Sequence, residues 1–99
     1  MERNVVIELQ TLERMVLNWK SNYLSMRTPE GGDEFLAEDL REEITTHVAP
    51  FIRRLHEEGH LSLSEAHGFL EGCYGHVEDL RKLLIEGDEE LWSIEDIAP

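Results

Sequence analysis

The sequence predicts an all-α protein, an antiparallel helical bundle of three to four helices that forms one domain over residues 1–99. Two long segments carry apolar residues at alternating steps of three and four, which is the spacing of a helix with one buried face. Turn-forming glycines and prolines separate the helical segments. No segment alternates apolar and polar residues between turn signals, as a half-buried strand would.

The first long helix is expected over residues 2–26. Its main apolar line keeps an unbroken heptad spacing and comprises Val5, Leu9, Leu12, Val16, Trp19, Tyr23 and Met26. A second line, formed by Val6, Leu17 and Leu24, lies about 110° further around the helix. Because this helix is apolar over more than one face, we expect it either to lie centrally in the bundle or to pack against a second copy of the protein.

A break follows at residues 27–34, RTPEGGDE. The residue before Pro29 is disfavoured in a helix, and Gly31 and Gly32 allow the chain to turn. Asp33 is then the expected N-cap of the next helix, because its carboxylate can accept hydrogen bonds from the unpaired amides of the first turn.

The second helix is expected over residues 34–58, with one irregularity. Its apolar stripe comprises Leu36, Leu40, Ile44, Val48, Phe51, Ile52 and Leu55. Pro50 removes a backbone hydrogen bond and clashes with the preceding turn, so we expect a kink or a break near residues 47–50. Gly59 is expected to end the helix as its C′ residue.

The third helix is expected over residues 63–86. Ser62 and Glu65 have the spacing of a capping box at its start. Its apolar stripe is again an unbroken heptad and comprises Leu63, Ala66, Leu70, Cys73, Val77, Leu80 and Leu84. Gly87 is expected to end this helix, which leaves residues 87–99 as a short acidic tail with at most two helical turns.

The chain carries a net charge of −13, and this narrows the classes of partner. Residues 28–99 contain nineteen acids and only five bases. Such a surface repels the phosphates of nucleic acids and of anionic membranes, so we expect no direct binding to either. A basic protein, in contrast, would be attracted to it.

Composition also indicates a compartment. No apolar run exceeds three residues, so no membrane span is expected. The single cysteine can form no internal disulfide. The single cysteine favours a cytoplasmic protein, because disulfides are rare in reducing compartments.

The stretch HGFLEGCYGH, residues 67–76, concentrates metal-ligating residue types in the third helix. His67 and His76 lie on opposite flanks of the apolar stripe, so they cannot converge on one ion. His67 and Glu71, at positions i and i+4, are the one pair on this helix that could share a metal ion. No second cysteine and no metalloenzyme motif accompanies them, so we predict solvated histidines, with no catalytic residue, metal or cofactor.

Three glycines of the same stretch indicate a contact surface. Gly68, Gly72 and Gly75 fall within one sector of the helix, opposite the apolar stripe. Each costs about 1 kcal/mol relative to alanine in a helix interior. A patch without side chains allows another backbone to approach closely, so we interpret this glycine patch as an interaction surface. Surface glycines that only loosen the helix are the alternative.

The C-terminal acidic block, residues 86–96, contains six acids and no base together with Leu91, Trp92 and Ile94. Apolar anchors among acids are typical of a segment that docks into a basic, grooved partner. Alternatively, these anchors fold back and cover the end of the bundle.

These observations predict a small acidic interaction or regulatory protein without enzymatic activity. We expect it to form a homodimer through the second apolar line or the glycine patch, and to bind a basic protein, with nucleic-acid mimicry as a specific form of that binding. The alternative is a metal-binding or catalytic bundle that uses His67, Glu71 and either His47 or His56.

Overall fold

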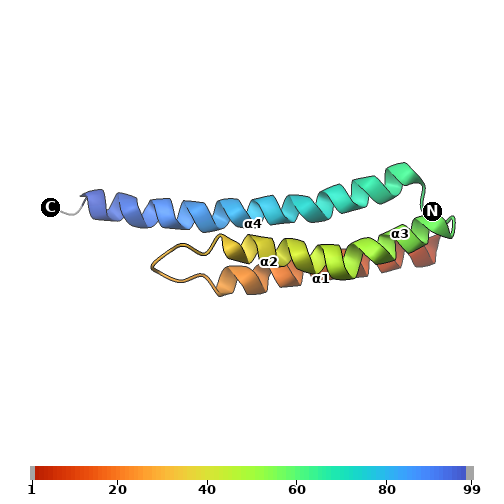
Figure 1. Ribbon diagram of the computed structural model, residues 1–99, viewed down its shortest axis with the longest axis horizontal. Coiled ribbons are helices and arrows are strands. Elements are labelled where there is room, and N and C mark those ends of the chain that lie inside the picture. Colours follow the sequence, from red (N-terminus) through yellow and green to blue (C-terminus); the bar gives the residue numbers. More distant parts are fainter. Residues whose placement is uncertain (1, 98–99) are drawn as a thin grey trace.

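The computed structural model describes the backbone of residues 2–97 and the side chains of residues 2–85. The described chain forms three helical rods, and the predicted all-α bundle is confirmed (Figure 1). The first and third rods are single helices, whereas the middle rod joins two α-helices through a π-helix. In chain order the elements are α1 (Arg3–Ser25), α2 (Phe35–Glu43), η1 (Ile44–Val48), α3 (Ala49–Glu57) and α4 (Leu63–Ile97).

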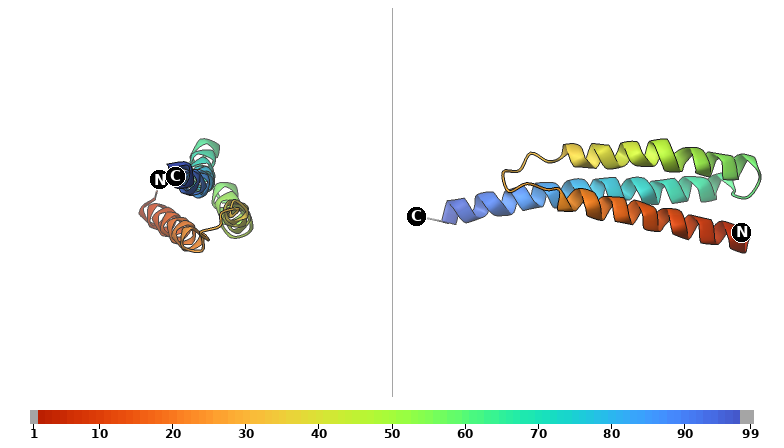
Figure 2. Two further views of the ribbon diagram at one scale, coloured as in Figure 1. Left: turned by 90° about the vertical axis from the view of Figure 1, so that its left-hand side faces the viewer. Right: turned by 90° about the horizontal axis from the view of Figure 1, so that it is seen from below.

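The rods run up, down and up. α1 and α4 are parallel to each other, and the α2–η1–α3 rod is antiparallel to both, so that the three rods form a triangle when viewed end-on (Figure 2). α1 packs on α2 and α4, and α4 also packs on α2 and α3. The bundle is an extended rod of 63 × 18 × 18 Å, because the C-terminal part of α4 continues beyond the loop that joins α1 to α2 (Figures 1 and 2).

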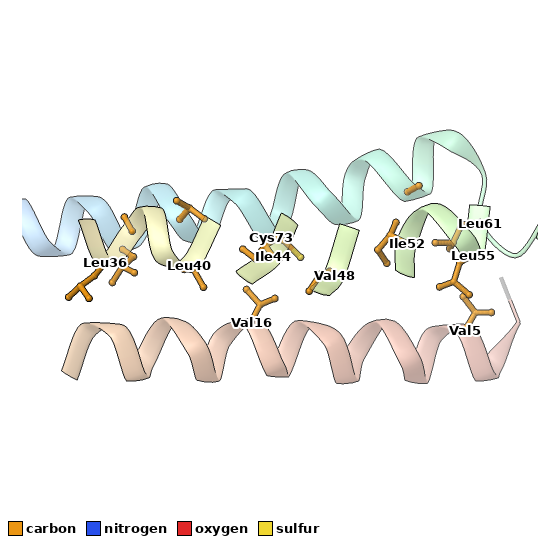
Figure 3. Packing of buried hydrophobic residues seen from close by; sticks show 14 of the residues in the cluster. Val5, Val16, Leu36, Leu40, Ile44, Val48, Ile52, Leu55, Leu61 and Cys73 are labelled. Atoms are coloured by element: carbon orange, nitrogen blue, oxygen red, sulfur yellow. The ribbon is translucent and has the colours of Figure 1, made fainter. Parts of the chain in front are cut away.

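The core is a single line of apolar side chains between the three rods (Figure 3). Most positions of the three predicted stripes are buried or half-buried, as the helical spacing requires. Two stripe positions at helix ends are exposed instead: Met26 follows the last residue of α1, and Leu63 is the first residue of α4. Leu61, which belongs to no helix, is buried between α3 and α4.

The irregularity predicted at Pro50 is a π-helical turn rather than a break. The amide of Ala49 donates to the carbonyl of Ile44, a step of five residues instead of four. This wider turn precedes Pro50, whose ring would clash with the carbonyl four residues earlier in a regular α-helix. Ile44, Val48 and Ile52 all remain fully buried, so the rod passes the proline without losing its core face.

The predicted turn between the middle rod and α4 is confirmed at both ends. Gly59 has φ +84°, and the amides of His60 and Gly59 donate to the carbonyls of Leu55 and His56, which together form a Schellman motif. At the start of α4, the Ser62 amide donates to Glu65, whose own amide donates to the Ser62 hydroxyl. Hydrogen bonding of the Glu65 carboxylate to the backbone amide and the side chain of Ser62 holds the pKa of Glu65 below its usual value.

Asp33 does not cap the middle rod, so that prediction is wrong. Glu34 occupies the N-cap position and makes no side-chain hydrogen bond to the helix. The Asp33 side chain, only 6% exposed, accepts hydrogen bonds from the Thr28 amide at 2.8 Å and the Thr28 hydroxyl at 3.0 Å. Asp33 therefore closes the α1–α2 loop by accepting hydrogen bonds from Thr28.

α4 does not end at Gly87, so the predicted tail over residues 87–99 is wrong for the part that the backbone describes. The helix continues to Ile97. One glycine costs a helix about 1 kcal/mol, whereas proline costs about 3 kcal/mol, and the first proline after Gly87 is Pro99. The intervening residues are rich in the good helix formers Glu and Leu. Among the described residues, no helix is both long and apolar enough to cross a membrane.

Candidate functional site

Carboxylates gather in a hollow between α1 and the middle rod, which we call the acidic hollow. It has a volume of about 270 Å³ and is lined by Tyr23, Asp39, Glu42, Glu43, Thr46 and His47. The three acids of α2 share one face of the helix because they are spaced at i, i+3 and i+4. Half of the lining residues are therefore acids, and none is lysine or arginine.

Aromatic rings flank these carboxylates. The Tyr23 hydroxyl of α1 donates to Glu43 Oε1 of α2 at 3.0 Å. The His47 ring lies 6.3 Å from the Trp19 ring, tilted by 54°. Burial, the hydrogen bond to Glu43 and the negative charges of Glu43, Asp39 and Glu42 together raise the pKa of Tyr23 to about 12. The hollow is thus a site of negative potential beside a phenol that stays protonated.

The raised pKa of Tyr23 predicts a loss of stability in alkali. The protonated phenol is favoured by the folded state, so its contribution is complete below pH 10 and disappears as the pH rises through about 12. We expect the difference in unfolding free energy between the wild type and Tyr23→Phe to be constant from neutral pH to pH 9 and to fall above pH 10. Urea denaturation across this pH range measures it. A difference that stays constant in alkali would contradict the assigned environment of Tyr23.

A second hollow lies on another side of the bundle, between the middle rod and α4. We call it the α3–α4 groove; it has a volume of about 590 Å³. Its lining residues are Thr45, Ala49, Pro50, Ile52, Arg53, His56, Leu63, Ala66, His67 and Leu70. None of them is an acid, although the chain carries a net charge of −13. Leu63 is 57% exposed, so the groove offers uncovered apolar surface.

The arginines of the middle rod and of α4 differ in the ion pairs that they form. Arg41 pairs with Glu78 of α4 at 3.3 Å, and Arg81 of α4 pairs with both Glu38 and Glu78. The Arg41–Glu78 and Arg81–Glu38 pairs connect α2 to α4. Arg53 is exposed and forms no ion pair with any described residue. Its guanidinium is therefore available to an acidic ligand.

His67 and Glu71, the candidate pair of metal ligands, are not joined by further ligands in the described part of the chain. His67 and Glu71 are both exposed and line the same shallow hollow, beside Arg41, Leu70, Tyr74, Gly75 and Glu78. No group of three or more His, Cys, Asp or Glu side chains in the described part of the chain could hold a metal ion. The other two candidate histidines are engaged elsewhere: His47 lies against Trp19, and His56 Nδ1 lies 2.9 Å from the Leu61 carbonyl.

The glycine patch lies on the surface, as its position on the helix predicts. Gly68, Gly72 and Gly75 are exposed, and a Cβ placed on any of them would meet no other atom within 4 Å. Among the described residues, the space directly above these three glycines is therefore open. The proposed contact of the glycine patch with another molecule stays a prediction.

The second apolar line of α1 is only partly covered. Val6 and Leu17 are 37% and 42% exposed, while Leu24 packs against the core. Lys20 reaches from the same helix to α4, with its ammonium 3.6 Å from Asp79. The side chains of the remaining predicted interaction residues lie outside those that the structure describes; these residues are Leu91, Trp92 and Ile94.

Neither hollow is predicted as a binding site from the sequence, although the residues that line each hollow form a recognisable pattern in it. Asp39, Glu42, Glu43 and His47 repeat at helical spacing on one face of the middle rod. Residues 44–56 contain no acid, which stands out in so acidic a chain. Comparisons with models of protein families, with curated proteins and with solved structures give no match for this chain. Function must therefore be inferred from these surfaces.

Proposed function

We propose that the protein is a non-enzymatic protein–protein interaction module whose acidic hollow receives basic side chains of a partner. The single observation that carries this proposal is the lining of the hollow. Three carboxylates, the phenol ring of Tyr23 and the imidazole of His47 line about 270 Å³, with no lysine or arginine among the lining residues.

The chemistry of the hollow suits a lysine or arginine side chain. Carboxylates form charge-assisted hydrogen bonds with an ammonium or guanidinium group. The faces of aromatic rings attract the same cations. The −13 charge of the chain would also draw a basic protein towards this surface and accelerate encounter. A partner that normally binds nucleic acid is a specific form of this proposal, because ordered carboxylates can replace phosphates.

We further propose that this binding takes place in the cytoplasm and serves regulation. Cys73, the only cysteine, is buried, and burial together with the charge of Glu13 raises the pKa of its thiol to about 11. Such a thiol is unreactive at neutral pH and needs no oxidising compartment.

A labelled peptide of alternating arginine and glycine tests the proposed function by fluorescence anisotropy. The double variant Asp39→Asn/Glu42→Gln removes two charges from the hollow and should weaken binding by about tenfold, since partly exposed charge pairs contribute about 0.7 kcal/mol each. The matched control is Glu8→Gln/Glu57→Gln, which removes two exposed acids elsewhere and should change binding less than about twofold.

Salt provides the second measurement. Binding should weaken as the salt concentration rises, because exposed charges are screened. Equal weakening by the two double variants would show that net charge alone attracts the peptide, and it would contradict a role for the hollow. Absence of binding at low salt would contradict the proposed function itself.

A further inference from the structure

The C-terminal end of α4 extends beyond the other elements that the structure describes (Figures 1 and 2). Thr45 bonds to Tyr74 and Arg41 to Glu78, so the middle rod and α4 pair antiparallel in a fixed register that places Phe35, the first residue of α2, level with Leu84. Beyond that level α4 continues to Ile97 past the α1–α2 loop (Figures 1 and 2). An isolated helical end of this length is only marginally stable in water.

This end has the composition of a docking segment. Residues 86–96 contain six acids, no base, and the apolar residues Leu91, Trp92 and Ile94. A helix of this composition requires a receptor that offers apolar surface without carboxylates. Tail-to-tail pairing of two such ends is disfavoured, because it would set six acids against six others.

The α3–α4 groove has the complementary composition. It is apolar, contains no acid, and carries the exposed Arg53 with His56 and His67. The segment cannot reach the groove of its own chain, because Leu63 and Leu91 lie about 42 Å apart along one helix at 1.5 Å per residue. Only another molecule can therefore place this segment in the groove.

We propose that a second copy of the chain seats the end of its α4 in the α3–α4 groove, and that the exchange is reciprocal. With the two α4 helices antiparallel and a two-fold axis level with Leu80, residues 91–97 of one copy lie beside residues 63–69 of the other. The same contact then forms twice and closes the assembly as a dimer. In this register Glu95 and Asp96 of each end lie close to the level of Arg53 of the other copy.

Sedimentation equilibrium of the full chain tests this dimer. The wild type should be a dimer, and Arg53→Glu should weaken association by at least about tenfold, because it opposes like charges at the contact. Arg14→Glu is the matched control: Arg14 is exposed on α1, forms no ion pair with a described residue, and should leave association unchanged. Trp92→Ala should weaken association as well.

Disulfide trapping tests the arrangement directly. The double variant Leu63→Cys/Ile97→Cys joins two positions that the two-fold axis places level with each other, and it should form a covalent dimer on mild oxidation, whereas each single variant should not. A disulfide within one chain is impossible over such a distance, because bonded cysteines have Cα atoms less than about 7 Å apart. The native Cys73 is buried and should not compete.

A monomeric wild type would overturn the proposed dimer. So would a dimer that survives both Arg53→Glu and Trp92→Ala, because it would have to use another face. Covalent dimers from the single variants at the yield of the double variant would also overturn it. None of these results bears on the acidic hollow, whose peptide binding is measured separately.

Discussion

The Leu80→Ala variant is expected to lose about 3 kcal/mol of unfolding free energy. Leu80 is fully buried in the line of apolar side chains between the three rods. Truncating a buried leucine to alanine removes its transfer free energy and leaves a cavity, which together cost about 2–5 kcal/mol. A domain of this size has a total stability of about 5–15 kcal/mol, so the loss is a large fraction of the whole. Urea denaturation followed by circular dichroism measures it.

Leu83→Ala is the matched control, three residues further along the same helix. Leu83 is 39% exposed, so its truncation leaves no closed cavity and should cost less than about 1 kcal/mol. Both variants should be compared in the Arg53→Glu background, because self-association adds concentration-dependent stability. Similar losses from the two substitutions would show that the core does not lie where α4 places it.

The difference in burial between Leu80 and Leu83 can be predicted from the sequence, because buried positions recur with the period of the helix. The heptad lines of α1 and α4 predict both helices and buried positions such as Val16, Val77 and Leu80. The burial of Leu61 cannot be predicted from a helical period. Leu61 lies in a turn, and it is buried because the Schellman motif at Gly59 folds the chain back over the end of the bundle.

Proline and glycine mark the other irregular positions in the sequence, but they do not determine which local structure forms there. Pro50 forbids a regular α-helix, but a kink, a break and a π-helical turn all satisfy that restriction. The π-helical turn keeps Ile44, Val48 and Ile52 in the core, which is a tertiary requirement. At Gly87 the local cost of about 1 kcal/mol is too small to end a helix whose following residues favour it.

The two hollows could not be predicted, because each joins segments distant in the chain. Tyr23 and Glu43 meet across two helices, and the register that brings them together is set by packing along the whole rod. The α3–α4 groove depends in the same way on where α3 crosses α4. The sequence shows the acids of the acidic hollow and the absence of acids in the α3–α4 groove, but it does not show the volume of either site.

Replacing Gly68, Gly72 and Gly75 together with alanine is expected to raise the unfolding free energy by about 2–3 kcal/mol. Each glycine lies inside α4, where alanine is favoured by about 1 kcal/mol, and each has open space where the new methyl group would be placed. Gly59→Ala should instead lower the unfolding free energy by about 1 kcal/mol, because φ +84° is strained for a residue with a Cβ. Chemical denaturation of the two variants measures these opposite signs.

The triple variant also decides what the glycine patch does. If another backbone packs on the patch, three methyl groups will hold the two surfaces apart, so the variant will gain stability as an isolated chain while losing that association. If the patch is bare surface, stability will rise and association will be unchanged. A triple variant that is less stable than the wild type as a monomer would contradict the open surroundings of all three glycines. The sign of the change in unfolding free energy thus tests whether the surroundings of the three glycines are open. Sedimentation equilibrium of the same variant tests whether these glycines contact another molecule.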